Sequence, residues 1–180
     1  MRISSARGFS LVETIIALGV LTVGLLGSAA VMTTGMQNLS SSPSDVVVAQ
    51  KATQAIEAVF AARDSHKLTW DQIRNVQGET GSDGGIFLDG PQPLRIEGPD
   101  GLVNTADDGA IETVILPGKD QLLGTADDRI VTLNGYTRQI AITTVANENG
   151  NLRQIVVTLT YMTGPTKRTY TMTTFISSYS

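Results

Sequence analysis

The stretch Gly8–Met32, GFSLVETIIALGVLTVGLLGSAAVM, determines how the rest of the chain is arranged. Its last nineteen residues, 14–32, carry no charge, and the next ionisable side chain after Glu13 is Asp45. At a rise of 1.5 Å per residue, these nineteen residues would form a helix of roughly 28 Å, about the thickness of the hydrocarbon core of a bilayer. The sequence therefore predicts a membrane-spanning helix that carries a separate domain.

Glu13 is a carboxylate at the edge of this apolar span, where the ionised form is costly to maintain. Acidic side chains in such positions are candidates for a functional role. Two other interpretations stay open at this point. Glu13 could extend to the lipid headgroups, and the apolar run could belong to a secretory signal peptide that is cut in the Ala-rich segment after Gly27.

The order Arg7-Gly8-Phe9-Ser10-Leu11-Val12-Glu13, followed by a long apolar helix, resembles the class III leader of type IV pilins and pseudopilins. The segments 17–21 and 23–27 resemble most closely the PilV-type minor pilins. The resemblance covers roughly the first forty residues, and its residue types fall in a fixed order. It implies that a prepilin peptidase cuts between Gly8 and Phe9 and methylates the amino group of Phe9. The apolar helix would then stay on the mature protein.

The resemblance also implies how the subunit is assembled. In that family, the acid matching Glu13 neutralises the N-terminal amine of a phenylalanine within the filament core. An isolated amine and an isolated carboxylate would each be costly in a desolvated helix bundle, and pairing offsets much of that cost. The implied partners are thus other pilin or pseudopilin subunits, which Phe9 and Glu13 would contact. One departure is that Ala30 stands where many pilins carry proline, which puts the family's usual kink in doubt.

The charge and composition narrow the possible functions. The 180-residue chain has 13 basic and 17 acidic residues and a net charge of −4, and loss of Arg2 and Arg7 with the leader would leave 11 basic residues and a charge of −6. We expect no nucleic-acid partner, because attraction to phosphates needs clustered basic residues. The chain has no cysteine, so disulfides and thiolate chemistry are excluded.

Basic residues precede the apolar span and none follow it closely. This asymmetry predicts a single-pass protein with a cytoplasmic N-terminus. Together with the resemblance, it predicts a location in the bacterial inner membrane and later in a periplasmic or extracellular filament.

The residues after the span predict an α+β class and, through the resemblance, the type IV pilin fold. Ser42-Pro43-Ser44-Asp45 is typical of a helix start, which predicts an interruption near Pro43 and a second helix up to Arg63; one continuous bent helix is the alternative. The apolar residues of that second stretch recur at spacings of three and four, so they should pack on the sheet. They are Val48, Ala52, Ala55, Ile56, Val59 and Phe60.

The C-terminal third of the chain predicts an antiparallel sheet. Residues 136–143, 154–161 and 170–176 alternate in polarity with a period of two and are separated by turn-forming residues. Residues 85–89 and 94–97 are shorter candidates. Trp70 is predicted to be a core side chain, and the single histidine, His66, is assigned no role. The predicted organisation is a leader (1–8), a transmembrane and filament-core helix (9–42), an amphipathic helix (43–63) and a β-sheet head (64–180).

Two acidic segments form an internal repeat. GPDGLVNTADD, residues 98–108, is echoed twenty residues later by GKDQLLGTADD, residues 118–128. Carboxylates in glycine-containing loops are the chemistry that calcium requires, and the pattern is similar to acidic loops of secreted calcium-binding proteins and of type II secretion pseudopilins. We therefore expect calcium as a cofactor of loops 98–109 and 118–129; ordinary hairpin loops with solvated acids are the alternative. The candidate ligands are Asp100, Thr105, Asp107, Asp108, Asp120, Thr125, Asp127 and Asp128.

These observations predict a structural minor pilin of a type IV pilus-like filament, with head loops stabilised by calcium. No catalytic residue is predicted, because the sequence shows no Cys–His pair, nucleophile elbow or histidine metal cluster. Three alternatives remain: a minor pseudopilin of a type II secretion system, a major pilin, and a membrane-tethered extracellular enzyme or calcium-binding module.

Overall fold

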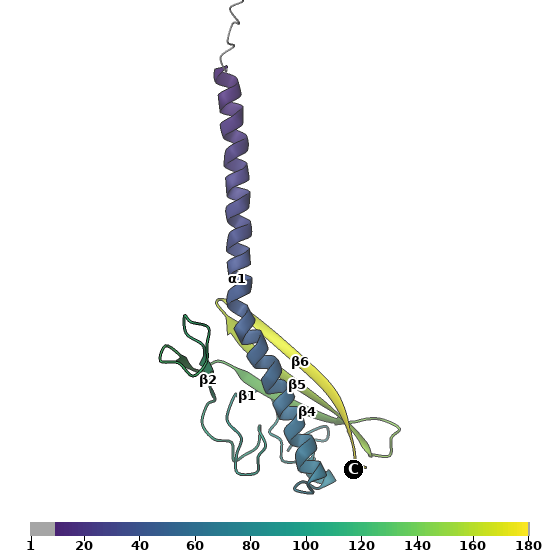
Figure 1. Cartoon of the computed structure of the whole chain (residues 1–180). Helices are drawn as coiled ribbons and strands as arrows, with labels where there is room; N and C mark the ends of the chain where they lie inside the picture. Colours follow the sequence, from purple (N-terminus) through teal and green to yellow (C-terminus); the bar gives the residue numbers. More distant parts are fainter. Residues whose placement is uncertain (1–9, 180) are drawn as a thin grey trace, which may run out of the picture. The chain divides into compact units, whose positions relative to one another are not determined.

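The computed structural model describes residues 10–179, without the side chains of residue 34 and residues 36–43. The chain divides into two units, Met1–Pro43 and Ser44–Ser180. One helix, α1 (Leu11–Asp64), includes residues of both units (Figure 1). The predicted cleavage between Gly8 and Phe9 lies outside the described residues.

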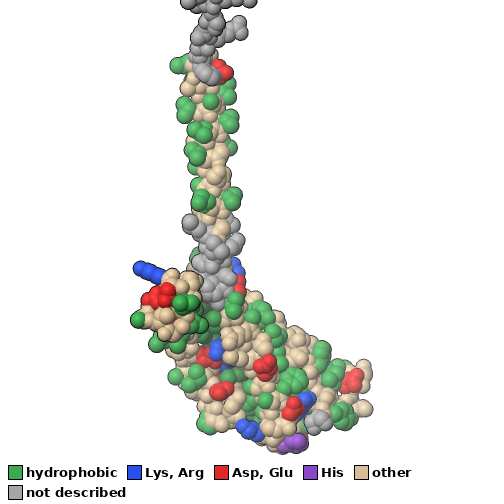
Figure 2. Space-filling model, in the orientation of Figure 1, with side chains coloured by type: hydrophobic (Ala, Val, Ile, Leu, Met, Phe, Trp, Pro, Cys, Tyr) green, Lys and Arg blue, Asp and Glu red, His purple; other side chains and the backbone are tan. Residues whose placement is uncertain are grey.

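The first unit contributes an apolar helical segment. Leu11–Thr33 has a mean hydropathy of 2.3, and none of its most apolar window is buried within the structure. Figure 2 shows apolar side chains around this part of α1. A helix that is hydrophobic all round requires an apolar surrounding, such as lipid or a bundle of other helices. Its length and composition are sufficient for it to cross a membrane.

The helix assignment continues through Ser42 and Pro43, so the structure has one helix where the sequence predicted a helix start. The single-helix alternative is the one observed. Proline removes one hydrogen bond from a helix interior, but its fixed φ is close to the helical value, and the residues on both sides continue the helix. The division between the two compact units nevertheless falls at this proline.

The second unit packs the C-terminal part of α1 against a four-stranded antiparallel sheet (Figure 1). The three longer predicted strands are present, and each pairs with its neighbour along the chain. The order is β1 (Gln92–Pro93), β4 (Thr137–Thr144), β5 (Leu152–Thr163) and β6 (Thr166–Ser177). The predicted antiparallel meander is therefore confirmed, and the α+β architecture is that of a helix covering one face of a sheet.

The core forms between the helix and the inner face of the sheet. Burial alternates along β4 and β5, as a sheet with one covered face requires. The predicted helix stripe is confirmed, since Val48, Ala52, Ala55 and Val59 are buried. Ile56 and Phe60 are partly buried and pack against the same core.

Trp70 also packs against this core, as predicted. It lies in a short 3-10 helix, Trp70–Gln72, and its indole Nε1 donates a hydrogen bond to the Gly150 carbonyl at 2.9 Å. The guanidinium carbon of the buried Arg153 lies 4.1 Å from the ring centroid. Burial and, to a smaller extent, the nearby Arg74 lower the pKa of Arg153 to about 10. His66 is exposed.

A two-stranded hairpin was missing from the sequence prediction. It consists of β2 (Thr113–Leu116) and β3 (Arg129–Thr132), and the second acidic segment connects the two strands. We call residues 113–132 the arm. Neither shorter candidate strand forms: 85–89 contributes only a bridge from Phe87 to Asn75, and 94–97 a bridge from Arg95 to Ile111. Such short strands leave too few alternating positions to be recognised in a sequence.

Candidate functional site

In the first acidic loop, 98–109, the carboxylates accept hydrogen bonds from the loop's own backbone amides and from a threonine hydroxyl. Asp100 Oδ1 accepts a hydrogen bond from the Leu102 amide at 2.7 Å. Asp108 Oδ2 accepts from the Asn104 amide at 2.9 Å. The Thr105 hydroxyl donates to Asp107 Oδ1 at 2.8 Å. The structure thus brings Asp100, Thr105, Asp107 and Asp108 into one compact loop.

The second acidic loop, 118–129, repeats this arrangement. Asp120 Oδ1 accepts from the Leu122 amide at 2.9 Å, and Asp128 Oδ2 accepts from the Gly124 amide at 2.6 Å. The Thr125 hydroxyl donates to Asp127 Oδ1 at 2.8 Å. The sequence repeat is therefore a repeat of hydrogen bonds as well as of residue types.

The backbone repeats too. Asn104 has a φ of 62° and its counterpart Gly124 a φ of 86°; both values lie in the left-handed region, which asparagine and glycine tolerate best. Each loop also opens on a glycine that admits no side chain. A Cβ on Gly98 would lie 2.5 Å from the Asp107 carboxyl carbon, and a Cβ on Gly118 would lie 2.2 Å from that of Asp127.

The two loops differ in what covers them. Leu102 and Val103 are 1% and 8% exposed, whereas their counterparts Leu122 and Leu123 are 62% and 66% exposed. Asn104 contributes to the difference, because its side chain attaches the first loop to β4. Its amide nitrogen donates to the backbone oxygen of the buried Arg138 at 2.7 Å. Gly124 has no side chain that could do the same.

The hydrogen bonds of the threonines lower the pKa of one carboxyl group in each loop. The Thr105 hydroxyl is the main cause of the lowered pKa of Asp107, and the Thr125 hydroxyl is the main cause for Asp127. Backbone amides of Asp100 and Lys119 add to the effect. These contacts favour the ionised form of each carboxyl group.

The predicted ligands do not converge on one point. Among residues 10–179, no three or more His, Cys, Asp or Glu side chains are grouped so that they could share a metal ion. Most of the carboxylate oxygens already accept hydrogen bonds from their own loop. One oxygen differs, since Asp128 Oδ1 is buried and has no hydrogen-bond partner. Its counterpart Asp108 Oδ1 accepts from the Thr105 backbone amide at 3.3 Å.

Glu13, the predicted assembly residue, lies in the first turn of α1 and is exposed. The two other residues of that prediction, Gly8 and Phe9, lie outside the described part of the chain. A carboxylate in the first turn interacts favourably with the positive end of the helix dipole.

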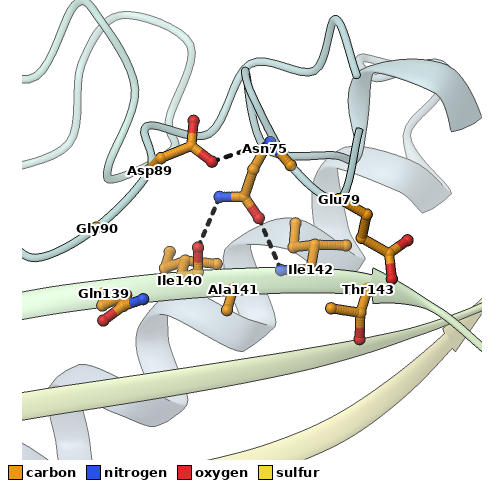
Figure 3. A pocket seen from close by; sticks show the side chains of 10 residues that line it. Asn75, Glu79, Asp89, Gly90, Gln139, Ile140, Ala141, Ile142 and Thr143 are labelled. Carbon is orange, nitrogen blue, oxygen red and sulfur yellow. Dashed lines mark hydrogen bonds between the residues drawn. The ribbon is translucent and has the colours of Figure 1, made fainter. Parts of the chain in front are cut away.

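The outer edge of β4 carries a polar site that sequence analysis missed. Asn75 is buried, and its side-chain amide donates to the Ile140 carbonyl at 2.8 Å and accepts from the Ile142 amide at 2.8 Å (Figure 3). Glu79 accepts from the Thr144 amide at 3.2 Å. A shallow pocket of about 160 Å³ lies beside these contacts. Asn75 and Glu79 therefore take the place of a neighbouring strand along the part of β4 that β1 does not pair with. A single asparagine in a loop gives no sign of this role in the sequence.

The other edge of the sheet, β6, has no such cover. Among the described residues, the only side chain that donates to a backbone atom of β6 is Arg63, to the Ser177 carbonyl at 3.0 Å. The charges of β6 are both near its start, at Lys167 and Arg168. The two sides of the sheet therefore differ in how far side chains occupy their backbone hydrogen-bonding groups.

Comparison with known proteins identifies the N-terminal segment. The family model described as the prokaryotic N-terminal methylation motif matches residues 3–29. The chain thus carries a type IV prepilin leader, which implies processing by a prepilin peptidase and assembly with other pilin subunits. Proteins of this family are structural pilin subunits. The curated proteins and the solved structures gave no match.

The matched segment includes Gly8, Phe9 and Glu13 and ends before the second unit begins. The architecture of that unit, a helix on an antiparallel sheet, is consistent with the type IV pilin fold. The leader and the apolar segment Leu11–Thr33 together indicate a membrane-anchored, single-pass protein.

Proposed function

We propose that this protein is a structural minor pilin of a type IV pilus-like filament. The observation that supports this most directly is the prepilin leader at residues 3–29, continuous with an apolar helix long enough to span a membrane. The resemblance of segments 17–21 and 23–27 to PilV-type proteins favours the minor class. The acidic head would lie outside the cytoplasm, and the subunit would be stored in the inner membrane before it is extracted into the filament.

Processing would create the charge that Glu13 needs as a partner. Cleavage after Gly8 would place the new amine on Phe9, two residues before α1 begins at Leu11. A positive amine at the start of a helix is unfavourable because it faces the positive end of the helix dipole. Glu13, one turn further on, can offset this, either in its own chain or in a neighbouring subunit.

The first experiment is intact mass measurement and N-terminal sequencing of the full chain from membranes. We expect a mature protein that begins at methylated Phe9. A Gly8→Val variant should keep its leader, whereas the nearby Ser5→Ala variant should be processed normally. A chain that begins near Gly35, or one that retains Met1 in cells with an active prepilin peptidase, would contradict the proposal.

Assembly is tested separately from processing. Glu13→Val should be cleaved but should be at least about tenfold depleted from sheared filaments, because the buried amine would lose its partner. Thr14→Val is the matched control. The same leader and fold would serve a minor pseudopilin of a type II secretion system or a major pilin. The machine whose deletion abolishes surface display, and the abundance of the chain in the filament, separate these alternatives.

We also propose that the acidic loops bind calcium. The support is the donor chemistry of the repeat and the buried oxygen of Asp128, which has no partner within its own loop. Carboxylate oxygens are the ligands that calcium prefers, and water can complete its shell. The second loop, 118–129, is the better candidate, because in the first loop the corresponding oxygen already accepts a hydrogen bond from the Thr105 amide. A bound ion would stabilise the loop by neutralising its adjacent carboxylates.

The test is thermal unfolding of the full-length protein in detergent after chelation, with added calcium or magnesium. Binding to the folded state alone should raise the melting temperature with calcium concentration. Asp128→Asn should remove most of this rise, and Asp108→Asn should remove less. An unchanged melting temperature at millimolar calcium would contradict calcium binding. The carboxylates would then serve only to accept hydrogen bonds within their own loops.

A further inference from the structure

We infer that the outer face of the four-stranded sheet is a binding site for a neutral polysaccharide chain. The outer face is the side of the sheet opposite α1, formed by every second residue of β4, β5 and β6. The inference goes beyond the proposed function, because processing and assembly of a pilin require no polysaccharide. The twelve positions are Thr137, Gln139, Ala141 and Thr143 of β4, Gln154, Val156, Thr158 and Thr160 of β5, and Thr169, Thr171, Thr173 and Phe175 of β6.

The distribution of charge across this sheet is the reverse of the usual one. An antiparallel sheet with one covered face normally carries apolar side chains there and polar or charged ones on the solvated face. Here Arg138 and Arg153 are 1% and 0% exposed on the covered face, and Arg168 pairs there with Asp45 of α1 at 3.2 Å. None of the twelve outer positions is charged, although the chain has 13 basic and 17 acidic residues. An exposed surface without charge is complementary to a partner without charge.

The charges closest to the outer face lie at its margins. Glu79 and Asp89 lie beside the β4 edge, where they accept hydrogen bonds from the Thr144 amide at 3.2 Å and the Gln77 amide at 2.8 Å. Lys167 lies at the opposite end, in the row next to the β5–β6 turn. Two acids and one cation at the margins do not attract an acidic polymer, so the ligand that fits this face is a neutral one.

The polar side chains of the outer face are available to a ligand. Within the described part of the chain, its threonines and glutamines form one side-chain hydrogen bond, between the Thr158 and Thr171 hydroxyls at 3.5 Å. Threonines elsewhere in the head are engaged in the fold. The Thr53 hydroxyl donates to the Ala49 carbonyl at 3.1 Å, and the Thr105 hydroxyl donates to a carboxylate of its own loop at 2.8 Å. Hydroxyl groups that can both donate and accept are thus left free on one surface.

The outer face has a regular spacing. Thr160 lies directly between Thr137 and Thr169, so one row across the three strands consists of threonine alone. Neighbouring strands are about 4.8 Å apart and alternate residues of one strand about 6.7 Å apart, so the twelve positions cover roughly 10 Å by 20 Å. Phe175, which is 52% exposed, lies in the last row at the other end. The face therefore combines rows of hydroxyl and methyl groups with one aromatic ring.

This composition fits a polysaccharide better than a protein or a crystal surface. Protein interfaces depend on large aromatic anchors, among which threonine is under-represented, and Phe175 is the only aromatic side chain of the twelve. A polysaccharide presents hydroxyl groups, which pair with threonine and glutamine, and C–H groups, which pack on methyl groups and on an aromatic ring. Neighbouring strands also twist by roughly 20–25°, which a flexible chain can follow and a rigid crystal plane cannot.

An array of immobilised polysaccharides tests the inference with the full-length protein in a detergent that has no sugar headgroup. The neutral probes are dextran, amylose, galactomannan and β-1,3-glucan, and the acidic controls are alginate and carboxymethyl dextran. We expect retention on at least one neutral polysaccharide, unchanged at high salt because no ion pair is involved. Absence of retention on every neutral probe would overturn the inference, as would retention on the acidic probes alone.

Substitutions that keep the sheet folded test the role of the hydroxyl groups. Thr158→Val with Thr171→Val removes two hydroxyls from one cross-strand pair, and valine suits a strand as well as threonine does. Binding to the retained polysaccharide should weaken about tenfold at an unchanged melting temperature. The matched control is Thr113→Val with Thr132→Val, an exposed cross-strand pair in the arm, which should bind normally. Equal binding by both double variants would overturn the inference.

Two further substitutions test the neutral character and the aromatic ring. Thr171→Lys should weaken binding at least about tenfold because it places a charge in the middle of the face, whereas Thr132→Lys in the arm should not. Phe175→Ala should weaken binding about fivefold, and Ile130→Ala, which removes another exposed apolar side chain, should leave binding unchanged.

The outcomes are distinguishable from those for the proposed function. Cleavage at Phe9 is measured separately, so a processed pilin that binds no neutral polysaccharide would overturn this inference alone. Failure of cleavage would instead contradict the pilin function and leave polysaccharide binding to be judged on the array. Self-association that the Thr158→Val and Thr171→Val variant loses, without retention on any polysaccharide, would overturn the inference, because a second copy would then be the ligand of this face.

Discussion

Asn104 and Arg138 hold each other through two hydrogen bonds of 2.7 Å. The Asn104 amide nitrogen donates to the Arg138 backbone oxygen, and Arg138 Nε donates to Asn104 Oδ1. Arg138 Nη2 also donates to the Arg95 carbonyl at 3.1 Å, and Glu112 Oε1 lies 3.9 Å from Nη1. Asn104 thus accepts a hydrogen bond from a buried guanidinium and donates one to a strand carbonyl. It is therefore the attachment point of the first acidic loop.

Asn104→Ala should destabilise the protein by about 3 kcal/mol, because it leaves the guanidinium Nε and a backbone carbonyl buried without partners. Denaturant unfolding of the full-length protein in detergent measures the loss. Asn149→Ala is the matched control, since Asn149 also has a positive φ, 51°, but is exposed. It should cost only about 1 kcal/mol of backbone strain. Equal losses in the two variants would show that strain, rather than the buried contacts, accounts for the effect.

Asn75→Asp should cost about 2 kcal/mol, because a carboxylate cannot donate to the Ile140 carbonyl. Hydrogen exchange provides a local readout. The Ile142 amide, which donates to Asn75 Oδ1, should exchange faster in the variant than in the native protein. Asn134→Asp, at an exposed turn position, is the control and should leave both measurements unchanged. Unchanged protection at Ile142 in Asn75→Asp would contradict the role assigned to Asn75.

Ionisation of Tyr161 should make the stability of the folded protein depend on pH in the alkaline range. Burial and the hydrogen bond that its hydroxyl donates to Asp45 together raise its pKa to about 12. A raised folded-state pKa contributes stability that is complete below pH 10 and is lost as the pH rises toward 12. Tyr161→Phe should therefore be less stable than the native protein below pH 10, and the difference should shrink above it. Tyr179→Phe, at an exposed position, should show no such trend.

Protonation of Asp107 and Asp127 should make the stability of the two acidic loops depend on pH in the acid range. Their folded-state pKa values lie below the ordinary value of 3.8, so their contribution to loop stability is present above that pH and is lost as the pH falls through the lowered values. Thr105→Val and Thr125→Val should raise the pKa of Asp107 and Asp127, respectively, toward 3.8. Carboxyl NMR titration measures this change. Thr132→Val, at an exposed strand position, should leave both values where they are.

Long periodic segments made most of the fold predictable. The apolar run after Glu13 and the alternation in β4, β5 and β6 each repeat one preference over many residues, so the pattern exceeds local noise. The helix start predicted at Pro43 failed, because proline is compatible with the first turn of a helix and also with an interior position at the loss of one hydrogen bond. The sequence favoured the first possibility and left one continuous bent helix as the alternative.

The repeat was predictable as a chemical unit, but its environment was not. The shared string Thr-Ala-Asp-Asp identified two equivalent loops, and the hydrogen bonds at Thr105 and Thr125 are equivalent. The first loop is attached to the sheet through Asn104, which is Gly124 in the second loop and whose partner Arg138 lies far along the chain. The same holds for Asn75, whose partners are backbone groups of β4. Contacts of this kind depend on tertiary placement, which no local pattern contains.

The unequal edges of the sheet limit how these heads can aggregate. Amyloid-like growth requires that each added strand present a fresh row of free amides and carbonyls to the next molecule. Here β6 can receive a strand, but on the other side of the sheet β4 is covered by the two-residue strand β1 and, further along, by Asn75 and Glu79. Two heads that joined through β6 would therefore leave no free row for a third. A membrane-anchored protein, whose copies are concentrated in one plane, is protected in this way from polymerising through its sheet.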